Sequence, residues 1–293
     1  MDEQVWLAER FAEHRSHLRA VAYRMLGSLS ETDDALQEAW LRASRADVSQ
    51  VHNLAGWLTT VVARVCLNML RSREHRREDP LDVQTADPLL GPASDGDPEQ
   101  EAVMADSVGV ALLVVLAILT PAERVAFVLH DLFAVPFEEI APMLERSPDA
   151  TRQLASRARR RVKGAAPAPN VDLTRQREIV QAFLSATRGR DFHALITLLH
   201  PDVVLRADKA VIPTPEPVTV HGAEPVAMGA MAAMQRAQFT GPALIDGTVG
   251  LAMAPHGHLR VALTFAVTDG LITAIDVIAE PDRLHRLDLA VLD

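Results

Sequence analysis

The sequence predicts a multidomain protein in which two all-α domains precede one α+β domain. Three observations support this fold class. Apolar residues recur at helical spacing up to about residue 164, two segments rich in proline interrupt the chain, and short runs of β-branched residues with alternating polarity follow residue 199. The chain of 293 residues is long enough for about two domains by length alone. We place the parts at 1–78, 79–104 (an acidic linker), 105–164, 165–173 (a second linker) and 174–293.

Composition excludes several classes of protein. The net charge of −10 argues against coating of nucleic acid by bulk electrostatics. Cys66 is a lone cysteine among apolar neighbours, which indicates a buried thiol and a reducing, cytoplasmic setting. No metal-site spacing, phosphate loop or nucleophile motif is present, so we expect no cofactor and no metal. The apolar run 108–119 is too short to span a bilayer, so we expect no membrane contact.

The first domain reads as helices throughout. Leu18, Val21 and Met25 share one helical face, and Gly27 ends that helix. We expect Ser30 to cap the second helix and Asn53 to cap a third, which ends in the basic run 71–77.

An acidic surface is expected on the second helix. Helical spacing exposes Asp33, Asp34, Gln37 and Glu38, while Leu36, Ala39 and Trp40 can pack inward. Paired carboxylates suit acid–base catalysis or a metal, yet no histidine stands nearby. A solvated face and a protein-docking face are the other two interpretations.

The third helix combines an aromatic residue with basic ones. Trp57 opens it, and Arg64, Asn68 and Arg71 follow. This combination suits melted, single-stranded DNA, because a base can stack while arginines hold phosphates. A tryptophan in the core explains Trp57 equally well.

The second domain carries two helix-start signals. Thr120, Pro121 and Glu123 form a capping-box pattern. Ser147 and Pro148 repeat the signal after a short helix near residues 135–144. Tight connections between three helices, the last of them basic, predict a helix-turn-helix.

That last helix has a polar face suited to the major groove. It displays Arg152, Gln153, Ser156, Arg157 and Arg160, whereas Leu154 and Ala158 can pack back on the preceding helices. A solvated basic face is the alternative. The capped start and the absence of acids between Asp149 and residue 171 favour nucleic acid.

The third domain begins with two helices within residues 173–201, and strands follow. The segment 259–279 reads as a β-hairpin around Thr268, Asp269 and Gly270. Its histidines and aspartates suggest no pair by their spacing, and they include His193, His200, Asp202, Asp208, His221, Asp246, His256, His258 and Asp276.

Two long motifs resemble a known family. Residues 22–42, "AYRMLGSLSETDDALQEAWLR", resemble region 2 of the extracytoplasmic-function (ECF) sigma factors of bacterial RNA polymerase, and residues 119–162 resemble their region 4. The remainder resembles the SnoaL-like (NTF2-like) domain, an α+β cone fused to one subgroup of that family.

The resemblance implies partners and sites. Asp33, Asp34, Gln37, Glu38 and Trp40 would dock on core RNA polymerase, through its β and β′ subunits. His52, Asn53, Trp57, Arg64, Asn68 and Arg71 would contact the minus-ten element of promoter DNA. Arg152, Gln153, Ser156, Arg157 and Arg160 would read the minus-thirty-five element.

The resemblance therefore favours a transcription initiation factor that is not an enzyme, with its own C-terminal domain as an intramolecular regulator. One alternative is a helix-turn-helix regulator whose SnoaL-like domain senses a ligand. It leaves the acidic face of the second helix unexplained. The other is a SnoaL-like cyclase with a DNA-binding leader.

Overall fold

The computed structural model describes residues 3–49, 51–76, 108–164, 172–211 and 216–292. The chain divides into two compact units. Of the described residues, the first unit holds 3–76 and 116–161, and the second holds 108–115 and 162–292. The predicted linkers 79–104 and 165–173 lie wholly or almost wholly outside the described residues.

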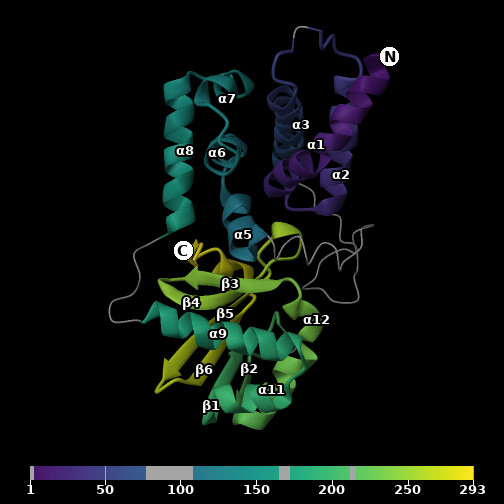
Figure 1. Ribbon diagram of the computed structural model, residues 1–293. Helices are drawn as coiled ribbons and strands as arrows, with labels where there is room; N and C mark the ends of the chain where they lie inside the picture. Colours follow the sequence, from purple (N-terminus) through teal and green to yellow (C-terminus); the bar gives the residue numbers. More distant parts are fainter. Residues whose placement is uncertain (1–2, 50, 77–107, 165–171, 212–215, 293) are drawn as a thin grey trace. The chain divides into compact units, whose positions relative to one another are not determined.

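The first unit begins with three helices, α1 (Glu3–Leu26), α2 (Leu29–Ala43) and α3 (Leu54–Arg76), drawn in purple and blue in Figure 1. Leu18, Val21 and Met25 are fully buried between them, as their spacing predicts. Cys66 is also fully buried, and burial raises the pKa of its thiol to about 12. The cysteine is therefore a structural residue, as expected.

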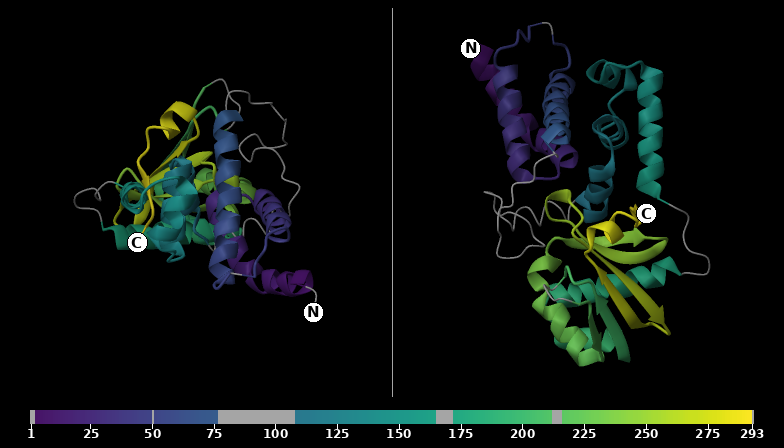
Figure 2. Two further views of the ribbon diagram at one scale, coloured as in Figure 1. Left: turned by 90° about the horizontal axis from the view of Figure 1, so that it is seen from above. Right: turned by 180° about the vertical axis from the view of Figure 1, so that it is seen from behind.

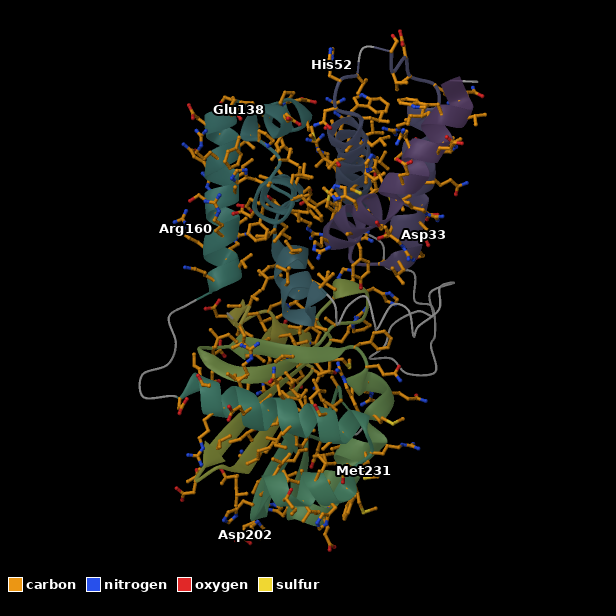
Figure 3. All side chains as sticks on the ribbon, viewed as in Figure 1. Asp33, His52, Glu138, Arg160, Asp202 and Met231 are labelled. Carbon is orange, nitrogen blue, oxygen red and sulfur yellow. The ribbon has the colours of Figure 1, made fainter. Side chains whose placement is uncertain are left out.

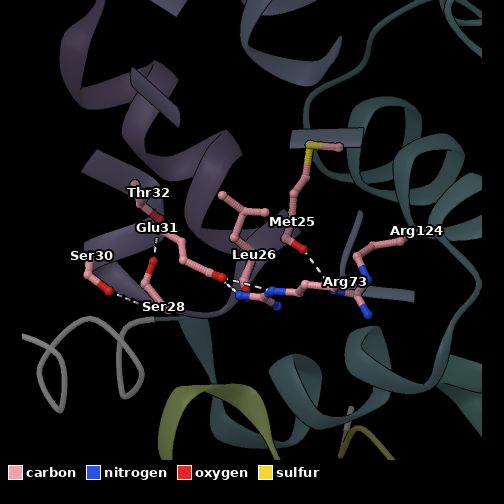
Figure 4. A network of polar contacts seen from close by, with 8 residues as sticks. All are labelled: Met25, Leu26, Ser28, Ser30, Glu31, Thr32, Arg73 and Arg124. Atoms are coloured by element: carbon pink, nitrogen blue, oxygen red, sulfur yellow. Dashed lines mark hydrogen bonds and ion pairs between the residues drawn. The ribbon is translucent and has the colours of Figure 1, made fainter. Parts of the chain in front are cut away.

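The end of α1 is held by two arginines (Figure 4). Gly27 adopts a positive φ of 77° and ends the helix, leaving the carbonyl groups of Met25 and Leu26 near its terminus. Arg73 Nη1 donates to the Leu26 carbonyl at 3.3 Å, and Arg124 Nη1 donates to the Met25 carbonyl at 2.8 Å. Arginines from two segments distant in the sequence thus supply hydrogen bonds to carbonyl groups at the same helix terminus.

The predicted cap of α2 is wrong. The N-cap is Ser28, whose carbonyl accepts from Thr32, and Ser30 lies inside the helix. The chain turns back into a helix within two residues of Gly27, so the cap comes earlier than the acidic first turn suggests. The Ser28 hydroxyl instead lies 3.0 Å from that of Ser30.

The second helical segment contains α5 (Val110–Ile118), α6 (Pro121–Phe127), a π-helical turn η1 (Val128–Leu132), α7 (Phe137–Leu144) and α8 (Pro148–Lys163). The Thr120 capping box is confirmed, because the Thr120 hydroxyl accepts from Glu123 N and the Glu123 carboxylate accepts from Thr120 N. The boundary between the two units falls inside α5, after Val115.

The second unit packs helices against a mixed sheet (Figures 1 and 2). Its elements are α9 (Leu173–Arg188), α10 (Phe192–Leu198), β1 (Leu199–Ala207), β2 (Val218–His221), α11 (Ala223–Ala232), α12 (Met234–Ala237), β3 (Thr240–Ile245), β4 (Thr248–Met253), η2 (Pro255–Gly257), β5 (Val261–Thr268), β6 (Leu271–Ile278), α13 (Pro281–Leu284) and β7 (Leu289–Ala290). The strand order is β2-β1-β6-β5-β4-β3-β7, and only the β1–β6 pair is parallel among these strands.

The predicted hairpin is confirmed as β5 and β6. Asp269 and Gly270 both adopt positive φ, which is the backbone of a type I′ turn, and Thr268 pairs with Leu271. Helices α11 and α12 were not predicted. Their sequence is rich in alanine and methionine and contains Pro225 and Gly229, so it lacks both a clear polar face and a cap signal.

Candidate nucleic-acid interface

Helix α8 turns one small-residue face inward and a polar face outward. Thr151, Ala155 and Ala158 are fully buried, and Leu154 is half-buried. The side chains predicted to read DNA are all exposed, namely Arg152, Gln153, Ser156, Arg157 and Arg160. Figure 3 shows Arg160 projecting outward from α8. Packing on small side chains lets the helix backbone lie close to its own unit, with the long polar side chains directed outward.

The helix-turn-helix connection is tight. Helix α7 ends at Leu144, its C-cap residue Glu145 adopts the left-handed conformation (φ 54°), and Arg146 N donates to the Ala141 carbonyl. Ser147 then caps α8 as predicted, since its hydroxyl accepts from Ala150 N at 3.2 Å. Three residues, Glu145, Arg146 and Ser147, separate α7 from α8.

The arginines of α8 fall into two groups. Arg159 pairs with Asp131 at 2.5 Å, and Arg161 pairs with the buried Glu123 at 3.2 Å, so both hold α8 to its own unit. Arg152 pairs with Asp149 at 2.5 Å and lies over the ring of Phe137.

Arg157 and Arg160 form the second group. Neither makes an ion pair among the residues that the structure describes. Sequence spacing alone did not separate these two residues from the arginines that hold the helix in place.

Helix α3 presents a second polar row. Asn53 caps the helix as predicted, because its side-chain oxygen accepts from Gly56 N at 3.0 Å. Arg64, Asn68 and Arg71 are exposed at intervals of four and three, along one side of the helix. Trp57 is half-buried, which leaves part of its ring open for stacking.

The loop before α3 is anchored by Val48, which is buried. Asp47 accepts from Ser49 N at 2.9 Å, and hydrogen bonds from the Ser49 side chain and backbone hold the pKa of Asp47 below its ordinary value. His52 and Asn53 are exposed at the end of the loop, where Figure 3 shows His52.

One arginine of the basic run at the end of α3 is engaged in contacts within the protein. Arg73 pairs with Glu31 of α2, in addition to its bond to Leu26. Arg71 remains exposed. Arg77 and the side chains of His75 and Arg76 lie outside the described residues.

The acidic face of α2 has the predicted form. Asp33, Asp34, Gln37 and Glu38 are exposed, and Trp40 is half-buried with its ring 5.3 Å from that of Phe11, edge to face. Asp33 lies 3.6 Å from Arg19, and Glu38 pairs with Arg42 at 2.8 Å. Asp34 has no ion-pair partner within the described part of the chain.

The described residues give little support for a metal site, a membrane-spanning helix or a catalytic carboxylate. The described residues contain no cluster of three or more histidine, cysteine or acidic side chains that could hold a metal ion. No helix in the described ranges is both long and apolar enough to cross a bilayer. In the second unit, Asp208 is buried but is engaged by Ala279 N, Glu280 N and Arg283.

These features define a helix-turn-helix protein that displays exposed arginine, glutamine and serine side chains on α8 and carries a second helical bundle with its own polar rows. Comparison with known families makes the class specific. Residues 10–76 match Sigma-70 region 2, and residues 109–162 match Sigma-70 region 4.

Curated relatives extend the likeness to the whole chain. It is 36% identical to the ECF RNA polymerase sigma factor SigJ of Mycobacterium tuberculosis, over 93% of this chain and 91% of that protein. It is 32% identical to a probable ECF RNA polymerase sigma factor, SigI, of the same species, over 94% of this chain and 93% of the relative. The chain belongs to the ECF RNA polymerase sigma factors.

Solved structures were also compared. The crystal structure of M. tuberculosis SigJ is 32% identical, with a TM-score of 0.44 over 95% of this chain and 98% of that one. An NTF2-like protein from Cytophaga hutchinsonii is 16% identical, with a TM-score of 0.26 over 40% of this chain and 99% of that one. The fold class is as predicted, since two helical sigma regions are followed by a domain in which helices pack against a mixed sheet.

Proposed function

We propose that this RNA polymerase sigma factor reads the minus-thirty-five element with α8, using Arg152, Gln153, Ser156, Arg157 and Arg160. The observation that carries this assignment is the division of the arginines. Arg159 and Arg161 are bound to acids of their own unit, whereas Arg157 and Arg160 are exposed without such pairs. Arginine side chains free of internal carboxylates are available for guanine edges and phosphates.

The test measures promoter binding by holoenzyme reconstituted with Arg157→Ala or Arg160→Ala. We expect promoter affinity to fall about tenfold for each variant, as is typical when an arginine contact to DNA is lost. The dependence of affinity on salt should also become less steep, because fewer counterions are released.

Arg159→Ala is the matched control on the same helix. Its partial exposure means that the pair with Asp131 contributes only about 0–1 kcal/mol of stability. We expect promoter affinity close to that of the wild type. If Arg159→Ala weakens promoter binding as much as Arg157→Ala, the assigned reading face is wrong.

Region 2 supplies the other contacts in this proposal. The loop and α3 engage the melted minus-ten strand through His52, Asn53, Trp57, Arg64, Asn68 and Arg71, where the accessible part of Trp57 offers a stacking surface. The acidic face of α2, with Asp33, Asp34, Gln37, Glu38 and Trp40, docks on core polymerase at its β and β′ subunits. We expect the protein to act in the cytoplasm, where bacterial transcription takes place.

The second unit regulates the sigma regions in cis. Its place in the same chain gives it a high local concentration relative to them. Sigma factors as a family are not enzymes, and we assign no catalysis to this unit either. This unit contains a cavity lined mainly by apolar side chains. No histidine, aspartate or glutamate among the residues described lines it, so an acid–base pair is not found there.

A further inference from the structure

The second unit encloses an apolar cavity of about 370 Å³. It lies between the sheet and helices α9, α11 and α12, with Phe183 on α9, Leu251 on β4 and Ile275 on β6 among its lining residues. Apolar cavities of about 150 Å³ already hold a molecule the size of benzene. A cavity of this volume is in the range of small-molecule sites.

Few polar groups line the cavity, and they already have partners. The Thr187 hydroxyl donates to the Phe183 carbonyl at 2.9 Å, and the Thr240 hydroxyl donates to the Arg236 carbonyl at 2.9 Å. The Arg236 side chain or backbone also takes part in a further interaction. The other lining residues are apolar. A ligand with many polar groups would therefore lose hydration and gain few partners.

The strands show that this space is open to a ligand. Leu205, Val218, Val220, Leu263 and Val277 line the cavity, yet each is only half-buried. On the opposite face of the sheet, Thr219 and Arg206 pair across β2 and β1 and are exposed. Inward-facing valine and leucine side chains thus keep contact with solvent, which is unfavourable unless another apolar molecule covers them.

Small residues on the helices keep the cavity from being filled. Gly229, Ala230 and Ala233 face it from α11 and its end. A Cβ added at Gly229 would meet no atom within 4 Å, so packing does not require glycine at this helical position. Glycine costs a helix up to about 1 kcal/mol relative to alanine.

From these observations we propose that the cavity binds one uncharged, mainly hydrocarbon small molecule, which makes the second unit a ligand sensor. The lining is almost entirely apolar and contains no carboxylate, lysine or imidazole group, and its one charged residue, Arg236, has an interaction partner of its own. The regulation in cis proposed above is what such a sensor would control. Ligand binding itself is measured without polymerase or DNA, so its outcome is independent of that regulatory role.

The experiment uses the full chain and the uncharged dye N-phenyl-1-naphthylamine, whose fluorescence rises in apolar surroundings. We expect saturable binding of one dye per chain. We expect 1-decanol to displace the dye and decanoate, which has the same chain length and a negative charge, to be at least tenfold weaker. Absence of saturable binding, or displacement by decanoate as readily as by decanol, would overturn the proposal.

Two pairs of variants locate the site. Val220→Trp places an indole in the cavity and should lower dye affinity at least tenfold, whereas Thr219→Trp places it on the outer face and should leave affinity unchanged. Gly229→Phe and Met228→Phe form a second pair on α11, in which Met228 is 66% exposed and does not line the cavity. Equal affinity within both pairs would contradict the assignment, once thermal unfolding shows that the variants are folded.

Discussion

At the scale of single residues, Cys66 provides a direct test of how well the first unit is packed. The side chain is fully buried in α3, and burial raises the pKa of its thiol to about 12. At pH 8 the native thiol is therefore almost entirely protonated, and the reactive species is the thiolate.

We predict that Cys66 does not react with a disulfide reagent such as dithionitrobenzoate in the native protein at pH 8, and reacts fully in guanidinium chloride. Absorbance of the released thiolate measures both states. Ser185→Cys, at an exposed position of α9, is the control and should react rapidly in the native protein. Fast native labelling of Cys66 would show that the first unit opens locally or packs differently.

The residues also show which parts of the site could be predicted from sequence. The exposure of Asp33, Asp34, Gln37 and Glu38 follows from helical periodicity, and the structure agrees. The division of the α8 arginines could not be predicted. It depends on Asp131 and Glu123, which are brought to α8 by tertiary packing across 28 and 38 residues of sequence.

At the scale of elements, Glu123 joins the start of α6 to the end of α8. Its carboxylate accepts from Thr120 N at 3.2 Å and pairs with Arg161 at 3.2 Å, although the side chain is 7% exposed. A single carboxylate thus completes the capping box and anchors α8.

We predict that Thr120→Ala lowers the free energy of unfolding by about 1 kcal/mol, because Glu123 N loses its side-chain partner. Denaturation by urea, followed by circular dichroism, measures the change. Thr60→Ala is the control in the same unit, since the Thr60 hydroxyl donates to a carbonyl within α3 and caps no helix end. An equal loss of unfolding free energy in both variants would mean that the capping box stabilises the protein no more than a threonine hydrogen bond inside a helix.

Elements were predicted well where the signal is local. The caps at Asn53, Thr120 and Ser147 and the turn at Asp269 and Gly270 depend on neighbouring residues, and all four are present. The cap at Ser30 was misplaced by two residues, because an acidic first turn indicates only roughly where a helix begins. Helices α11 and α12 were missed, because their small residues follow the shape of the cavity rather than an amphipathic pattern.

At the scale of the whole molecule, the question is what the second unit does for the sigma regions. We predict that deleting residues 165–293 changes transcription from the protein's own promoters several-fold in a reconstituted assay with core polymerase. Regulation in cis requires a covalent connection, so the separate fragment 165–293 added in trans at equal concentration should restore little of the difference.

Circular dichroism of the shortened chain is the control, since Val110 of α5 lies close to Gly241 of β3 and loses that neighbour in the deletion. Helix content should match that of regions 2 and 4. Unchanged promoter activity in a folded, shortened chain would refute regulation by the second unit.

The parallel pairing of β1 with β6 has a consequence for the order of events during synthesis. Val204 pairs with Ala274, which the ribosome adds 70 residues later, whereas α1 to α8 are all complete by residue 163. Local helical contacts form quickly, and distant strand pairings form slowly. Each newly made chain thus passes through an interval in which helices α1 to α8 are complete and the sheet that lines the proposed ligand cavity is not.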